Sequence, residues 1–180
     1  KISSETGGVI SAIVCDVTDV NQIETAFQKL INDHGRVDIL VNNAGTSSAS
    51  PFDETSDEVW DYDIELKVYG AIRCSRIAVE HMKKQGGGRI VNITTPGGKA
   101  PGPSSVPTSV SRAAGIALTK AMSKDLASDN ILVNTVGVGL IKSGQHRRRW
   151  EKINEQEANV SLDDFYEDMG SRVPMGRVGE

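Results

Sequence analysis

The feature that most constrains the fold is an alternation between short apolar runs and longer segments with helical periodicity. Four apolar runs are separated by three such segments; the runs are Ile10–Val14, Val37–Val41, Arg89–Thr95 and Ile131–Val136. Strands that alternate with helices pair in parallel, because each helix returns the chain to the same end of the sheet. The sequence therefore predicts an α/β fold with a doubly wound parallel sheet, covered by helices on both faces.

The helical segments carry recognisable start and stop signals. In the first, apolar residues recur at three- and four-residue intervals over Ile23–Ile31. Thr18 or Asp19 can cap its start, and Gly35 suits a left-handed position after its end. The other two helices are expected over about residues 56–85 and 108–128.

Length and charge limit the class of protein. The 180 residues suit one domain, and 20 Lys+Arg against 24 Asp+Glu give a net charge of −4, which does not favour nucleic-acid binding. No apolar run is long enough to span a membrane. Cys15 and Cys74 lack the spacing of metal ligands or of a disulfide framework, so no metal site is expected. We expect a cytoplasmic protein.

The composition changes after Gly144. His146–Arg149 is basic, and an acidic, helix-prone stretch follows it to about Met169. Such charge runs are usually solvated surface. Because the stretch follows the carboxyl end of the last predicted strand, where ligands bind in open α/β sheets, residues 144–180 are also a candidate substrate lid.

Six short motifs, in order, resemble the short-chain dehydrogenase/reductase family over nearly the whole chain. They are Asp16–Asp19, Gly35–Asp38, Asn42–Gly45, Gly88–Ile93, Ser109–Ala114, and Val133-Asn134 before Gly139–Ile141. The resemblance implies a single Rossmann-like domain over residues 1–180, an oxidoreductase that uses NAD or NADP, and a small carbonyl or alcohol substrate. It also implies a homodimer or homotetramer, formed through the two long helices.

The family begins with a strand, a glycine-rich turn and a helix that hold the cofactor pyrophosphate through backbone N–H groups. The glycines at 7–8, 86–88 and 97–98 have neither the spacing nor the preceding strand of that turn. We therefore expect that the first βαβ unit is missing and that the chain is part of a longer protein. The residues that separate NAD from NADP in the family fall in that missing unit.

Cofactor-binding residues can be transferred from the family by position. Asp16, with Val17 beside it, matches the acid that accepts a hydrogen bond from adenine, and Asn43, Ala44 and Gly45 match the adenosine ribose side. The segment that grips the nicotinamide carboxamide corresponds to three residues, Gly139, Ile141 and Ser143. Taken alone, Asp16 also suits a helix cap, and Asn42–Gly45 a turn at the end of a strand.

The catalytic positions of the family, an Asn, a Ser, a Tyr and a Lys, are all changed. By spacing they correspond to Lys67, Thr95, Thr108 and Arg112. Thr95 keeps a hydroxyl that can bind a carbonyl oxygen. Thr108 cannot replace a phenol as acid, because an aliphatic hydroxyl is far less acidic. Arg112 can bind ribose hydroxyls, but it stays protonated and cannot transfer a proton.

These changes leave three hypotheses open. In the first, the chain transfers hydride and Lys67 donates the proton, its pKa lowered by burial and by Arg112; alternatively Lys67 only pairs with Asp63, four residues earlier, on the helix surface. In the second, the chain is a non-catalytic binding or scaffold protein. In the third, His146–Arg149 contacts a phosphate or nucleic acid, or steers an anionic substrate.

Overall fold

The computed structural model describes residues 2–155 and 159–180 and divides the chain into two compact units, residues 1–136 and 137–180. The helices of the first unit are α1 (Ile2–Thr6), α2 (Val20–His34), α3 (Asp57–Ile64), α4 (Gly70–Lys84) and α5 (Thr108–Asp125). The strands are β1 (Ile39–Asn42), β2 (Gly88–Thr94) and β3 (Ile131–Gly137). Short 3-10 turns lie at Phe52–Glu54, Pro96–Gly98 and Ala127–Asp129.

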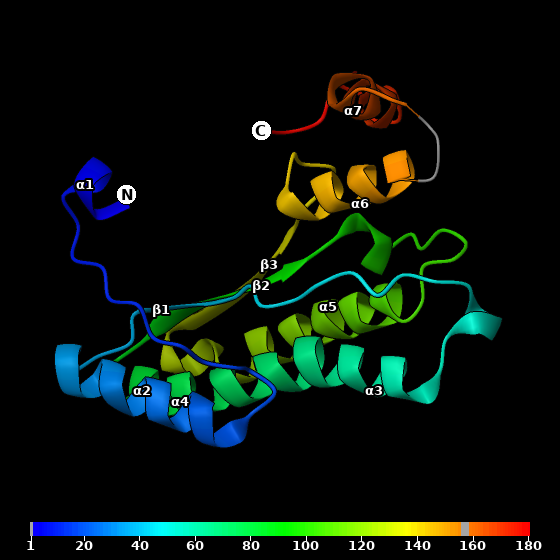
Figure 1. The fold of residues 1–180 in the computed structure, drawn as a ribbon. Helices are drawn as coiled ribbons and strands as arrows, with labels where there is room; N and C mark the ends of the chain where they lie inside the picture. The colour runs from blue at the N-terminus through cyan, green and yellow to red at the C-terminus, as the bar shows by residue number, and fades with distance from the viewer. Residues whose placement is uncertain (1, 156–158) are drawn as a thin grey trace. The chain divides into compact units, whose positions relative to one another are not determined.

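The described strands form one sheet in the order β1-β2-β3 (Figure 1). β1 and β2 are parallel, with Ile39 opposite Arg89 and Asn42 opposite Asn92. Each crossover between neighbouring strands carries a long helix. The prediction of an α/β fold with a parallel sheet is therefore confirmed, with three strands in the described residues.

The first predicted strand is wrong. Residues 10–14 are neither strand nor helix, and Val14 is 96% exposed. An apolar run becomes a strand only when a neighbour satisfies its backbone N–H and C=O groups. β1 lies at the edge of the described sheet, and residues 10–14 do not pair with it.

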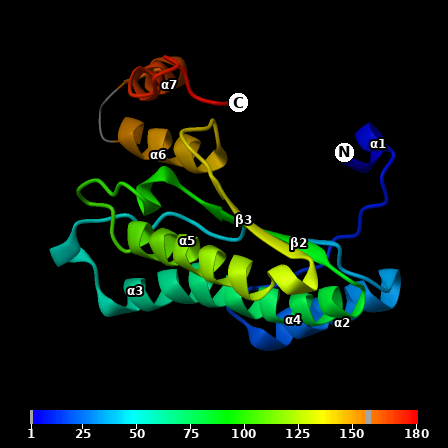
Figure 2. The same cartoon turned by 180° about the vertical axis from the view of Figure 1, so that it is seen from behind.

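Helices α2, α4 and α5 pack on one face of the sheet, as both views of the ribbon show (Figures 1 and 2). The core between these helices and the sheet centres on six buried residues: Val37, Ala78, Met82, Ile90, Ile131 and Val133. Phe27 of α2 and Met122 of α5 are packed against this cluster. The core therefore lies between the sheet and one helical layer.

The opposite face of the sheet is open. Four apolar side chains on this face are exposed. Ile39 is 65% exposed, and the other three are Val41, Leu132 and Val136. The prediction of helices on both faces is therefore wrong for residues 2–136. The strands are apolar enough for burial on both sides, but the helices described in this unit supply cover for one side only.

Local signals for helix α2 are confirmed. The Asp19 carboxylate accepts hydrogen bonds from the backbone N–H of Asn21 at 2.9 Å and of Gln22 at 3.2 Å. Gly35 ends the helix at φ 75°, a conformation that costs glycine little. Asp19 rather than Thr18 is therefore the cap.

The long helix expected over 56–85 runs from Asp57 to Lys84 and changes its winding in the middle. Residues Glu65–Tyr69 form a π-helical turn between α3 and α4. Such turns are rare, and they are frequent at functional sites. Lys67 lies in this turn and is buried.

The second unit contains α6 (Gly144–Glu155) and α7 (Leu162–Ser171). Both the Trp150 indole N–H and the Asn154 side-chain amide donate to the carbonyl of Val160, at 2.8 and 2.9 Å. Ile141 also forms a parallel bridge with Gly179. The predicted lid over 144–180 falls in this unit, and its role stays a prediction. None of the described helices is long and apolar enough to cross a membrane.

The one-sided core gives a direct prediction for two isoleucines on neighbouring strands. Ile90→Ala removes a fully buried side chain and should lower the free energy of unfolding by about 2 to 5 kcal/mol. Ile39→Ala, on the open face, should lower it by less than about 1 kcal/mol. Urea denaturation measures both; an equal loss in the two variants contradicts the open face.

Candidate functional site

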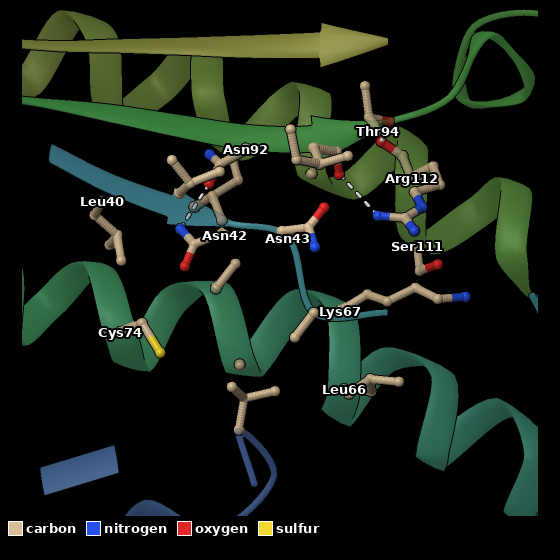
Figure 3. A pocket seen from close by; sticks show the side chains of 18 residues that line it. Leu40, Asn42, Asn43, Leu66, Lys67, Cys74, Asn92, Thr94, Ser111 and Arg112 are labelled. Atoms are coloured by element: carbon tan, nitrogen blue, oxygen red, sulfur yellow. Dashed lines mark hydrogen bonds between the residues drawn. The ribbon is translucent and has the colours of Figure 1, made fainter. Parts of the chain in front are cut away.

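A cavity of about 100 Å³ lies at the carboxyl ends of β1 and β2, between the sheet and helices α4 and α5 (Figure 3). Its lining includes Asn43 and Ala44, which follow β1, and Thr94, the last residue of β2. The π-helical turn contributes Lys67, and α5 contributes Arg112. Ligands of open α/β sheets bind at this end of the strands.

Lys67 forms a buried ion pair with Asp63. The two side chains are 1% and 0% exposed, and the Lys67 Nζ donates to the Asp63 Oδ1 from the next turn of the helix. The alternative of a surface ion pair is therefore wrong. Each charge has lost its water, so each depends on the other and on further hydrogen bonds.

Helix α5 supplies those further hydrogen bonds. The Ser111 hydroxyl donates to the Asp63 Oδ2 at 2.6 Å. The Thr108 Oγ1 accepts from Lys67 Nζ at 3.2 Å and from the backbone N–H of Ser48 at 2.9 Å. The Thr108 hydroxyl also donates to the Asp63 Oδ1, at an oxygen–oxygen distance of 3.5 Å. The Thr108 hydroxyl thus accepts two hydrogen bonds and donates one. It connects the start of α5 to the loop after β1 and to the helix that carries Asp63 and Lys67.

Burial lowers the pKa of Lys67, because the charged ammonium is desolvated. Asp63 opposes this change by stabilising the charged form, and the positive charge of Arg112 lowers the pKa further. The ammonium is therefore a stronger acid than an ordinary lysine side chain.

Arg112 lies in the same cavity with few partners of its own (Figure 3). Its Nη1 donates to the carbonyl of Ile93 at 2.7 Å, whereas its buried Nε has no partner in the described residues. Desolvation lowers the pKa of Arg112, and the negative charge of Asp63 raises it. A guanidinium remains protonated under these conditions.

Gly45 lies against both cations. A Cβ at this position would meet the Arg112 Nη2 at 3.0 Å and the Lys67 Cγ at 3.5 Å. Glycine therefore lets the backbone after β1 approach the two side chains closely. The motif Asn42–Gly45 therefore ends the strand and also brings the backbone close to Lys67 and Arg112.

Two further predicted residues lie near this site, and one lies outside it. Val17 lines the cavity and packs on Gly70, where a Cβ would meet its Cγ2 at 3.1 Å. Asp16 turns its carboxylate to Thr18, accepting from the backbone N–H and the hydroxyl at 2.9 Å each. Thr95 is half-buried and does not line the cavity; its neighbour Thr94 does.

The residues expected to hold the nicotinamide carboxamide belong to the second unit. The backbone carbonyl of Ser143 accepts from Arg147 N–H at 3.0 Å, and its hydroxyl accepts from His146 N–H at 3.4 Å, so Ser143 caps α6. Ile141 forms the bridge to Gly179, and Gly139 is exposed. Their binding roles stay predictions.

The sequence analysis did not predict that Asp63 and Ser111 are part of the buried hydrogen-bond network of the site. Asp63 and Lys67 are four residues apart, and Thr108 and Ser111 are three apart, so each pair shares a helix face. The small residues of α5 indicate that another element packs closely on that helix. They do not indicate which acidic side chain faces it. Cys74 also lines the cavity; burial raises the pKa of its thiol to about 11, so it stays protonated near neutral pH.

The sheet side of the cavity is held by a buried chain of polar groups. The Asn42 amide donates to the Asn92 Oδ1 at 2.8 Å and to the Ser75 Oγ at 3.0 Å. The Asn92 amide donates in turn to the Thr119 Oγ1 at 2.8 Å. These bonds connect the ends of β1 and β2 to α4 and α5, which makes the cavity wall rigid.

Comparison with known proteins identifies the family of the chain. The sequence pattern described as short chain dehydrogenase matches residues 1–154. The chain belongs to the short-chain dehydrogenase family. It is 33% identical over 173 residues to the 3-oxoacyl-[acyl-carrier-protein] reductase FabG of Thermotoga maritima, covering 96% of this chain and 65% of that protein.

Two solved structures of the family are similar to the fold. L-sorbose reductase from Gluconobacter frateurii, complexed with NADPH and L-sorbose, gives a TM-score of 0.93 at 25% identity over 99% of this chain and 68% of that one. An NAD⁺-bound xylitol dehydrogenase gives 0.84 at 29% identity over 97% and 69%. The chain therefore spans about two thirds of the length of these relatives.

The donor groups at the cavity, on Lys67, Arg112 and Asn43, suit the oxygen acceptors of such a cofactor. The buried Nε of Arg112 has no acceptor in the described residues, and the backbone at Gly45 lies close to the Arg112 Nη2. Within residues 2–155 and 159–180, no group of His, Cys, Asp or Glu is arranged to hold a metal ion.

The buried ion pair predicts a strong asymmetry between single and double variants. Asp63→Asn leaves the Lys67 charge without its counterion and should lower the free energy of unfolding by about 3 to 5 kcal/mol. Asp63→Asn combined with Lys67→Met should recover much of that loss, because no unpaired charge remains. Urea denaturation of the three proteins measures this coupling.

A matched control is the exposed pair Lys29–Asp33, which has the same spacing on α2. Asp33→Asn should change the stability little, because solvent screens that pair. If Asp63→Asn is as mild as Asp33→Asn, the pair does not hold the site together.

Proposed function

We propose that the chain is the catalytic part of an NAD(P)-dependent oxidoreductase that interconverts a carbonyl and an alcohol, with Lys67 as the proton donor. The observation that carries this proposal is a buried ammonium with a lowered pKa in a cavity at the carboxyl ends of the strands. Family membership and relatives that bind NADPH or NAD⁺ support the cofactor class.

When bound, the cofactor supplies or accepts the hydride at the carbonyl carbon. The residues of the chain then handle the proton. Two of the Lys67 N–H groups are bound to Asp63 and Thr108, which leaves the third for the substrate oxygen. In reduction, Lys67 gives this proton to the carbonyl oxygen and becomes a neutral amine, which is reprotonated from solvent.

Asp63, Thr108 and Ser111 position the ammonium rather than react. Asp63 stabilises the charged form, and Ser111 fixes its carboxylate through the 2.6 Å hydrogen bond. Thr108 aligns Lys67 by accepting from it, a role that a threonine performs as well as a more acidic group would. Arg112 lowers the pKa of Lys67 and is available to bind ribose hydroxyls of the cofactor.

The proposal predicts that Lys67→Met abolishes turnover and leaves cofactor affinity nearly unchanged. Carbonyl reduction is measured by the loss of NADH or NADPH absorbance, and affinity by cofactor fluorescence. In the wild type, the reduction rate should fall as pH rises through the Lys67 pKa, because the neutral amine cannot donate. That fall should lie below the ordinary lysine range, since burial lowers this pKa.

Lys29→Met is the control, because it also removes a lysine that pairs with an aspartate, but at the surface. It should retain turnover and the same pH profile. Substantial turnover by Lys67→Met, with that profile intact, rules out Lys67 as the donor.

One observation favours a second function, a cofactor-binding protein without turnover. The Thr108 hydroxyl is fully engaged within the protein, and Lys67 is tied to Asp63. Both functions require cofactor binding, so titration of the full-length protein, which is expected to include the glycine-rich turn, with NADH and NADPH should give saturable binding in either case. Saturable binding with no reduction across a panel of aldehydes, ketones and oxo acids supports the second function; no binding at millimolar cofactor contradicts both.

A further inference from the structure

Arg112 is a half-buried cation without an acidic partner of its own. No carboxylate in residues 2–155 and 159–180 forms an ion pair with it, and its Nη1 donates to the neutral carbonyl of Ile93. Its Nε is buried and has no acceptor among these residues. A charge in this state is costly unless another group compensates it.

The charges around the cavity do not balance. Asp63 contributes one negative charge, whereas Lys67 and Arg112 contribute one positive charge each, so the three groups sum to +1. Asp63 is already bound by Lys67, Ser111 and Thr108. It therefore has little capacity left for Arg112, and the cavity favours an anion from outside the protein.

The space beside Arg112 suits a small planar anion. The cavity volume of about 100 Å³ holds several water molecules, or a carboxylate with a few further atoms. The Asn43 side chain lines the same space (Figure 3) and offers an amide donor. Gly45, whose Cβ would meet the Arg112 Nη2 at 3.0 Å, lets the backbone approach the guanidinium closely.

We propose that Arg112 binds the carboxylate of the substrate, which is therefore a short oxo- or hydroxy-carboxylate. The planar guanidinium presents paired N–H groups that match the two oxygens of a carboxylate, which a lysine ammonium does not do. The reacting oxygen of the same molecule then lies toward Lys67, on the neighbouring wall of the cavity. The reaction half of this inference rests on the proposed function; the anion site stands without it.

The test separates binding from turnover. Thermal unfolding of the full chain is followed at constant ionic strength, with sodium acetate replacing sodium chloride, and with acetamide as the neutral counterpart of acetate. Acetate should raise Tm by about 3 to 6 °C at ten times its Kd, and acetamide should not. Inorganic phosphate in place of acetate should raise Tm less, because a tetrahedral anion matches the planar pair of Arg112 N–H groups less well than a carboxylate does.

Arg112→Gln should lose the acetate effect, and Arg36→Gln, which removes an exposed arginine paired with Asp38, should keep it. If Arg112→Gln does not fold, line broadening of the acetate methyl NMR signal by the wild type, with acetamide as reference, decides instead. Equal effects of acetate and acetamide overturn the anion site. A larger effect of phosphate overturns the carboxylate assignment.

Turnover then distinguishes the two proposals. With NADH or NADPH, pyruvate should be reduced in preference to acetone, and Arg112→Gln should lower kcat/KM for pyruvate by about tenfold to a hundredfold more than it lowers kcat/KM for acetone, because only pyruvate loses a partner for its carboxylate. Acetate binding without reduction of any carbonyl means that the proposed function fails and the anion site stands. Reduction of acetone with no acetate binding means the reverse.

Discussion

The buried pair of Asp63 and Lys67 is the constraint on which the site depends. Neither charge is solvated, so the surrounding segments have to provide every hydrogen bond that water would otherwise provide. Ser111 and Thr108 at the start of α5 meet this need, and Thr108 also holds the backbone of Ser48. The pair therefore holds three parts of the chain in place relative to one another: α3 with the π-helical turn, the loop after β1, and the start of α5.

Three of the four residues predicted as catalytic, Lys67, Thr108 and Arg112, lie in or around this pair and influence one another electrostatically. Lys67 requires an acid, Thr108 is small enough to lie over both groups, and Arg112 adds a second positive charge that the single acid does not neutralise. Thr95 does not take part, because it lies outside the cavity. The result is a cavity at the carboxyl ends of β1 and β2 in which two positive side chains face one negative side chain.

The sequence was sufficient where the deciding interactions are local. The Asp19 cap, the Gly35 stop and the helices over 20–34 and 108–125 follow from residues a few positions apart. It was insufficient for residues 10–14, because a strand depends on a distant neighbour. The same reason explains Asp63: its spacing from Lys67 shows that the two can pair, but whether they are buried depends on how α5 packs against them.

The central claim is that Lys67 is a buried ammonium acidified by its surroundings. The most direct measurement is an NMR titration of the lysine Cε and Nζ signals, with Lys67 assigned by its loss in Lys67→Met. We expect a pKa below the ordinary lysine value, and a rise of this pKa when Arg112 is replaced by Gln, because a neighbouring positive charge has been removed. An ordinary lysine pKa that does not respond to Arg112 would contradict it.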